Sequence, residues 1–204
     1  MRKLCSGLVG GLLVFLALAM APEAEAQVAW ESPLLVSPET PAGWGVYLTD
    51  PYPGNGIGVL STWRSRSGPG LGYRLGIAED RGDDVSVFAG LDASGMIMTA
   101  SNEFPFNMAW VLGAGLGVGD DVLLSFPLAL TLGRSVESDG VWFNPYVSPR
   151  VTLDAFFGDG NDLDLGLSVD LGIDMSFDPG WAIRFGGTLG DRSALAIGMS
   201  FRVL

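Results

Sequence analysis

The sequence predicts an all-β fold: a closed antiparallel up-and-down transmembrane β-barrel of about ten strands, with eight strands as the alternative. Between Leu163 and Phe177, apolar residues occupy every odd position and Asp, Gly or Ser every even one. Such alternation places the two sets on opposite faces of a strand. The 204 residues include 30 Gly, too many for a helical protein because glycine is poor in helix interiors. Similar alternating segments recur along the chain, and their number is even.

Alternation alone is compatible with two architectures. A soluble β-sandwich would place the apolar faces in a core, whereas a membrane barrel would turn them to lipid and enclose a polar lumen. The chain is 48% hydrophobic with a mean hydropathy of +0.36, and its only lysine is Lys3. A soluble domain normally carries a mixed surface of both charge signs. We therefore expect a barrel, and a secreted soluble β-sandwich that binds a ligand remains the alternative.

The chain divides into three parts. Residues 1–26 resemble a secretory signal peptide, because Arg2 and Lys3 precede a short apolar run that ends before Ala24-Glu25-Ala26. The run is shorter than the roughly 20 residues of a membrane-spanning helix, which makes a retained anchor the weaker alternative. Residues 27–42 are rich in proline and lack a clean period, which predicts an irregular N-terminal periplasmic arm. Residues 43–204 form the predicted outer-membrane β-barrel domain.

Turn signals separate the expected strands. In chain order they are TDPYPGNG, SGPG, EDRGDD, a longer link containing SGMIMTASNEFP, GDD, the short stretch after Ser135, GDGN, DPG and GDRS. The ten alternating segments between them are Gly43 to Leu48, Gly56 to Arg66, Gly70 to Ala78, Asp84 to Asp92, Phe106 to Val118, Val122 to Ser135, Val141 to Phe156, Asp162 to Phe177, Trp181 to Leu189 and Ala194 to Val203.

The number and length of these segments favour a membrane barrel. Single-chain bacterial outer-membrane barrels have even strand numbers and about 9–11 membrane residues per strand. Several segments exceed the usual soluble strand length of about 5–6 residues. An even count also returns the C-terminus to the periplasmic side on which the N-terminal arm is expected.

Aromatic residues gather at the strand ends that this topology places on the periplasmic side. Outer-membrane barrels carry aromatic girdles where lipid headgroups begin, whereas the aromatic residues of a sandwich core need not cluster at one end of alternate turns. The expected membrane-interface residues are Trp63, Tyr73, Phe106, Trp142, Phe177, Trp181 and Phe201.

The last segment, ALAIGMSFRVL, has an alternating apolar face that comprises Leu195, Ile197, Met199, Phe201 and Val203. This pattern resembles the C-terminal strand signal of bacterial outer-membrane β-barrel proteins, which the barrel-assembly machinery recognises. That signal usually ends on an aromatic residue, and this chain ends on Leu204. The resemblance implies location in the bacterial outer membrane, contact with its lipids, and insertion by the assembly machinery.

Four charged residues are expected inside the barrel. If Phe177 faces Trp181 across the DPG turn, Asp174 lies opposite Arg184, and a tight GDGN turn brings Arg150 near Asp170 or Ser168. We therefore predict a lumen ionic network of Arg150, Asp170, Asp174 and Arg184, because a buried charge requires a partner. An ionic plug that fills a small barrel is favoured, and a constriction in a narrow channel for small polar solutes is the alternative.

The composition also excludes several activities. The chain contains no histidine, which removes Ser-His catalysis and histidine-based zinc sites. The net charge of −12 argues against nucleic acid as a partner. Acidic turns such as EDRGDD could hold Ca²⁺ or Mg²⁺, but they are more simply a solvated rim. We expect no enzyme activity, no cofactor and no metal, and a structural or surface-interaction role; the oligomeric state is not predicted.

Overall fold

The computed structural model describes residues 32–50, 57–65, 70–79, 85–119, 122–158 and 161–202. The predicted signal peptide and residues 27–31 of the arm lie outside these ranges. No described helix is long and apolar enough to cross a membrane. The strands are β1 (Gly43–Asp50), β2 (Gly58–Arg64), β3 (Gly70–Glu79), β4 (Val85–Met98), β5 (Asn107–Val118), β6 (Val122–Gly133), β7 (Val136–Ser138), β8 (Val141–Phe157), β9 (Asp162–Asp178), β10 (Trp181–Gly190) and β11 (Ala194–Arg202).

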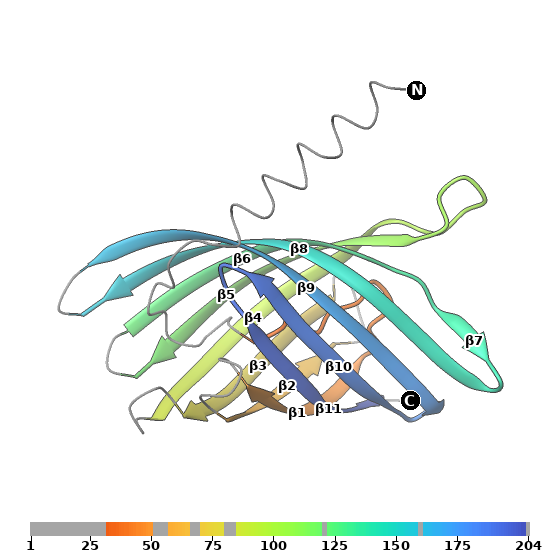
Figure 1. Ribbon diagram of the computed structural model, residues 1–204, viewed down its shortest axis with the longest axis horizontal. Helices are drawn as coiled ribbons and strands as arrows, with labels where there is room; N and C mark the ends of the chain where they lie inside the picture. Colours follow the sequence, from red (N-terminus) through yellow and green to blue (C-terminus); the bar gives the residue numbers. More distant parts are fainter. Residues whose placement is uncertain are drawn as a thin grey trace.

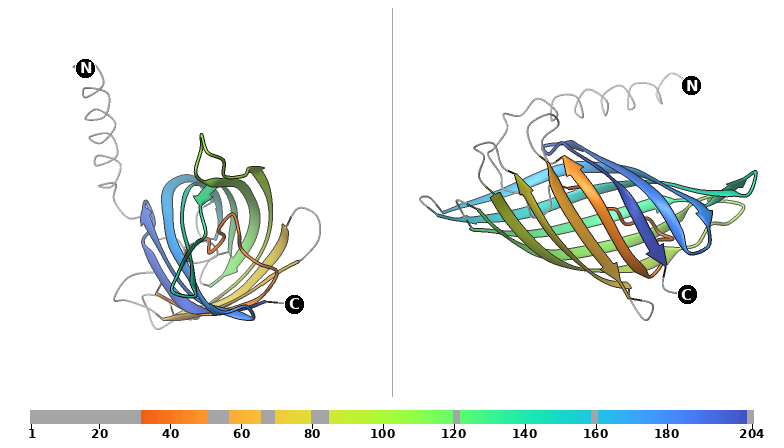
Figure 2. Two further views of the ribbon diagram at one scale, coloured as in Figure 1. Left: turned by 90° about the vertical axis from the view of Figure 1, so that its right-hand side faces the viewer. Right: turned by 90° about the horizontal axis from the view of Figure 1, so that it is seen from below.

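The strands form one sheet that closes on itself (Figures 1 and 2). Apart from β6 and β7, strands that follow one another in sequence pair antiparallel; β1 pairs with β11, and β6 pairs with β8. The short β7 continues the line of β6 beside β8, because the pair Gly133↔Tyr146 is followed by Val136↔Phe143. The barrel therefore has ten strands. This confirms the predicted up-and-down barrel, and the alternatives of eight strands and of a β-sandwich are wrong.

The predicted strand ranges agree with the observed ones to within a few residues, except at β4 and at the short β7, whose residues were expected in a turn. We expected the fourth segment to end at Asp92, but β4 continues to Met98. The stretch treated as part of a link pairs with β5 instead, through Gly95↔Trp110 and Met96↔Ala109, with a bulge after Met96. Its apolar residues extend the ladder beyond the point where strict alternation ends.

The outer face of the barrel is apolar. In β9 the odd-numbered residues from Leu163 to Phe177 are exposed or half-buried, and the even-numbered residues from Gly166 to Ser176 point inward. In strands β1–β6 and β8–β11, charged side chains on the outer face occur only at strand ends, such as Asp50 and Glu79. A soluble monomer rarely exposes a continuous apolar surface larger than a few hundred Å².

Inside the barrel, large aromatic rings lie against glycines on the neighbouring strand. Tyr146 stands opposite Gly172, and a Cβ built on that glycine would lie only 2.2 Å from the ring. Phe88 lies over Gly76 in the same way, with the corresponding distance 2.0 Å. These contacts need glycine, because any side chain there would occupy the space of the ring. They let a narrow barrel fill its interior with its own residues.

Candidate functional site: the filled lumen

The segment that precedes β1 runs inside the barrel (Figure 2, left panel). Leu34, Leu35 and Val36 are 0%, 2% and 4% exposed, and they belong to one apolar core with inward residues such as Tyr47 and Phe88. We expected residues 27–42 to form a periplasmic arm. The described part is irregular in backbone but lies within the lumen, because three consecutive apolar residues lose contact with water there.

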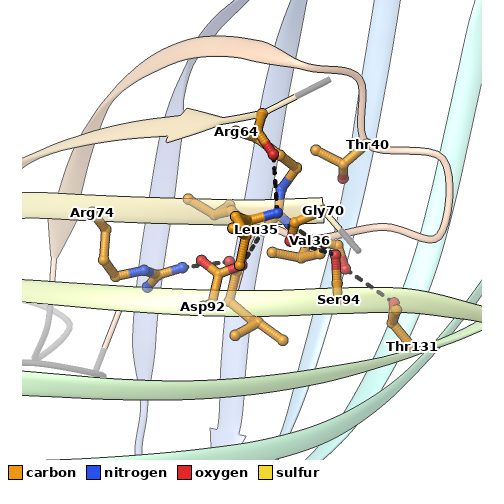
Figure 3. Close-up of polar contacts among 12 residues, drawn as sticks. Leu35, Val36, Thr40, Arg64, Gly70, Arg74, Asp92, Ser94 and Thr131 are labelled. Carbon is orange, nitrogen blue, oxygen red and sulfur yellow. Dashed lines mark hydrogen bonds and ion pairs between the residues drawn. The ribbon is translucent and has the colours of Figure 1, made fainter. Parts of the chain in front are cut away.

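Three inward side chains bind the backbone of this lumen segment, residues 32–41, at consecutive carbonyls. Arg74 Nη2 donates to Leu34 O at 2.5 Å. Arg184 Nη1 donates to Leu35 O at 2.9 Å, and Thr131 Oγ1 donates to Val36 O at 3.0 Å. Arg74 and Thr131 appear on either side of the segment in Figure 3.

These donors belong to β3, β10 and β6, which lie on different sides of the barrel. The carbonyls of an irregular, buried segment have no ladder partner and need such donors. The barrel wall therefore supplies the hydrogen bonds that the segment cannot form with itself.

A turn fastens the segment near the barrel end where β1 begins. Thr40 N donates to Ser37 O at 3.1 Å, and Ser37 N donates to Thr40 Oγ1 at 2.7 Å. Within this turn the Glu39 carboxylate accepts hydrogen bonds from Asn107 and Ser135. The turn is thus attached to the beginning of β5 and to the chain between β6 and β7.

The structure brings two of the predicted charged residues into a two-point ion pair. Asp174 stands opposite Arg184 in the β9–β10 register. Arg184 Nε and Nη2 donate to the two Asp174 oxygens at 2.5 and 2.7 Å. Arg184 Nη1 also donates to Tyr47 Oη at 3.2 Å, besides its bond to the lumen segment. One guanidinium therefore connects β9, β1 and the segment.

The other two predicted residues form a looser pair on the neighbouring strands. Arg150 stands opposite Ser168 and donates to its Oγ from Nε at 3.1 Å. Arg150 Nη2 lies 3.4 Å from Asp170 Oδ1, and Thr188 Oγ1 donates to that same oxygen at 2.6 Å. The four predicted residues thus lie in the lumen as two ion pairs rather than as one connected network.

Among the described residues, the lumen also contains two ion pairs that sequence reasoning missed. Arg64 pairs with Asp92 and donates to Ser94 Oγ at 2.8 Å (Figure 3), and Arg192 pairs with Asp154. The first pair could have been predicted, because the two-residue alternation of β2 and β4 places both Arg64 and Asp92 on the lumen side of the sheet. Arg192 lies in a turn, where no periodicity reveals its direction.

The predicted aromatic residues gather at one end of the barrel, where β1 begins and β11 ends. Four of them form a row across adjacent strands together with Trp44, which was not predicted, through the pairs Trp181↔Phe201, Phe201↔Trp44, Trp44↔Trp63 and Trp63↔Tyr73. The rings of Trp63 and Tyr73 are stacked with centroids 5.0 Å apart. Of the remaining predicted residues, Phe106 precedes β5, Trp142 lies at the start of β8 and Phe177 lies near the end of β9.

The DPG turn differs in detail from its predicted register. Trp181 pairs with Asp178 rather than with Phe177, and a bulge before Ile183 shifts the ladder by one residue. The rings of Phe177 and Trp181 still lie 5.9 Å apart. Beyond the bulge the register is the predicted one, which explains why Asp174 and Arg184 meet.

The lumen segment borders a small cavity. A cavity of about 20 Å³ lies between the segment and β1–β3, lined by residues that include Leu35, Arg64 and Asp92. Such a cavity holds about one water molecule. The predicted acidic turn residues Asp80–Asp84, Asp120, Asp121 and Asp159 lie outside the described residues.

No family model and no curated protein matches the chain. Among solved structures it is similar to a de novo designed transmembrane β-barrel, with 14% identity over 81% of this chain and 98% of that chain and a TM-score of 0.38. It is also similar to KdgM porin, with 10% identity, coverages of 79% and 99%, and a TM-score of 0.42. It is similar as well to KdgM porin in complex with disordered oligogalacturonate, with 8% identity over 81% of this chain and 100% of that chain and a TM-score of 0.41.

Proposed function

We propose that this protein is a non-enzymatic bacterial outer-membrane β-barrel with a closed lumen and a structural or surface-interaction role. The observation that carries the proposal is the lumen segment, whose carbonyls are bound by Arg74, Arg184 and Thr131. A pore through the barrel would have to pass this segment and the charged pairs beside it. The narrow solute channel remains the competing function.

The apolar outer face supports the membrane location. Large apolar side chains such as Leu71, Leu91 and Leu163 are 55%, 66% and 65% exposed, which is favourable in lipid and unfavourable in water. The row of aromatic residues at one barrel end matches the position of a membrane-interface girdle. The C-terminal β11, with its apolar outer face, is the strand that we expect the barrel-assembly machinery to bind.

Cell fractionation with heat-modifiable gel mobility tests the location. Recovery in the outer membrane, with a band that shifts on boiling, is the expected result. A soluble periplasmic or secreted product without a shift would refute the membrane proposal and with it the lipid contacts.

Planar bilayer recordings test the closed lumen. We expect the full mature chain to show no steady conductance, and a variant that lacks residues 32–41 to show discrete conductance steps. Heat-modifiable mobility of the variant establishes that its barrel is folded. Steady conductance of the unmodified protein that changes in Arg150→Ala or Arg184→Ala would favour the channel instead.

A further inference from the structure

A group of buried polar atoms on β8 and β9 has no hydrogen-bond partner among the described residues. The group, called here the β8–β9 polar cluster, comprises Tyr146, Ser148, Arg150, Thr152 and Asp170. These side chains belong to residues that are 5%, 0%, 2%, 0% and 0% exposed. The atoms without a hydrogen-bond partner among the described residues are Tyr146 Oη, Ser148 Oγ, Arg150 Nη1 and Nη2, Thr152 Oγ1 and Asp170 Oδ2.

The cluster is contiguous because its members occupy successive inward positions. Four of them follow one another at every second residue of β8, and Ser148 stands directly opposite Asp170 on β9. Arg150 Nη2 lies 3.4 Å from Asp170 Oδ1, a distance that allows attraction between the charges but is long for a hydrogen bond. One buried region thus contains guanidinium donors, a carboxylate acceptor and hydroxyl groups that can both donate and accept.

The lumen segment does not satisfy this cluster. Among the described residues, the hydrogen bonds of the segment to the barrel wall go to Arg74, Thr131 and Arg184 and, through Glu39, to Asn107 and Ser135. None of these residues belongs to β8 or β9, although Asp174, the partner of Arg184, lies on β9. Space is available beside the cluster at Gly166, which stands opposite Thr152. A Cβ built there would meet only Arg192 Nε, at 3.7 Å.

We propose that the β8–β9 polar cluster is a binding site for several ordered water molecules, which bridge Arg150, Asp170 and the neighbouring hydroxyl groups. Buried polar groups in folded proteins nearly always have a partner, and a bound water supplies it where no protein group does. Water fits this site because it both donates and accepts, as the mixture of guanidinium, carboxylate and hydroxyl groups requires. The lumen is then closed by the segment on one side and hydrated along β8 on the other.

Thr152→Val tests the proposal through stability in detergent micelles. If water binds the Thr152 hydroxyl, the substitution removes that bond and lowers the urea midpoint of unfolding. If the hydroxyl is buried without any partner, valine removes an unfavourable group and raises the midpoint. Thr131→Val is the matched control, because its hydroxyl has a protein partner in Val36 O, and its midpoint must fall under either view.

Water-to-protein magnetisation transfer in nuclear magnetic resonance provides the second readout. We expect cross-peaks between water and the backbone amides of Ser148, Arg150 and Thr152, with the sign expected for long-lived bound water. The backbone amides of Ala109 and Val111 on β5, whose buried side chains are apolar, serve as the comparison. The proposal is overturned if Thr152→Val raises the midpoint, or if the amides of Ser148, Arg150 and Thr152 show no stronger cross-peak to water than those of Ala109 and Val111. Bilayer conductance is not part of this test, so the closed lumen can fail independently.

Discussion

Replacement of Asp174 by alanine tests whether the buried ion pair on β9 and β10 stabilises the barrel. Asp174 and Arg184 are 2% and 3% exposed, and two hydrogen bonds join them. A hydrogen bond to a charged group contributes about 1.5–3 kcal/mol, and removing one partner of a buried pair costs about 3–5 kcal/mol. Arg184 keeps its bonds to Leu35 O and Tyr47 Oη, so we expect a loss near the lower end, about 3 kcal/mol.

Urea unfolding in detergent micelles measures this loss as a change in the free energy of unfolding. Asp164→Ala is the matched control, because Asp164 lies on the same strand and is exposed. An exposed substitution of this kind changes stability by about 0.5 kcal/mol or less. If Asp174→Ala and Asp164→Ala shift the unfolding midpoint equally, the reasoning about buried charge in this lumen is wrong.

Three other substitutions probe the interior packing, the outer face and the turn that fastens the segment. Gly172→Ala should cost about 1–3 kcal/mol because its Cβ would overlap the ring that covers it, whereas Gly166→Ala should be nearly neutral in the same unfolding assay. Leu171→Arg, at the middle of the outer face of β9, should cost about 2–4 kcal/mol for folding into lipid vesicles, and Leu163→Arg near the strand end about 0–1 kcal/mol; equal costs would contradict a membrane-spanning β9. Glu39→Ala should leave heat-modifiable mobility intact but produce brief conductance openings in bilayer recordings, and a uniformly silent baseline would show that this turn does not hold the segment.

The strand order and most strand bounds could be predicted because the outer face and the lumen impose a strict two-residue period. Strand bounds are predicted less well where the sequence departs from this two-residue period. β4 was predicted too short because its last residues, Met96 to Met98, are apolar without alternation. β7 was treated as part of a turn because its three residues, Val136 to Ser138, are too few to show a two-residue period. Pairing with a neighbouring strand decided both cases, and pairing is not visible in a single segment.

Within the lumen, register made part of the arrangement accessible from sequence. Counting back equally along both strands from the DPG turn placed Asp174 opposite Arg184, although a bulge alters the pairing of Trp181 itself. The position of residues 32–37 could not be obtained in this way, because an irregular segment has no period and its partners are scattered over β3, β6 and β10. Only the three-dimensional closure of the barrel brings those donors to one place.

The two features of the lumen, its ion pairs and its segment, depend on the same side chain. Asp174 holds Nε and Nη2 of Arg184, and this fixes the plane of the guanidinium and directs Nη1 toward Leu35 O and Tyr47 Oη. A lysine at this position would carry the charge but lack the rigid fork of donors. Arg184→Lys should therefore retain much of the ion pair with Asp174 but weaken the hydrogen bond to Leu35 O. The variant thus separates the contribution of Arg184 to the free energy of unfolding from its contribution to keeping the lumen closed. A folded Arg184→Lys barrel with openings in bilayer recordings would show that guanidinium geometry, beyond charge neutralisation, keeps the lumen closed; a folded variant that stays silent would show that the apolar contacts of Leu34, Leu35 and Val36 suffice.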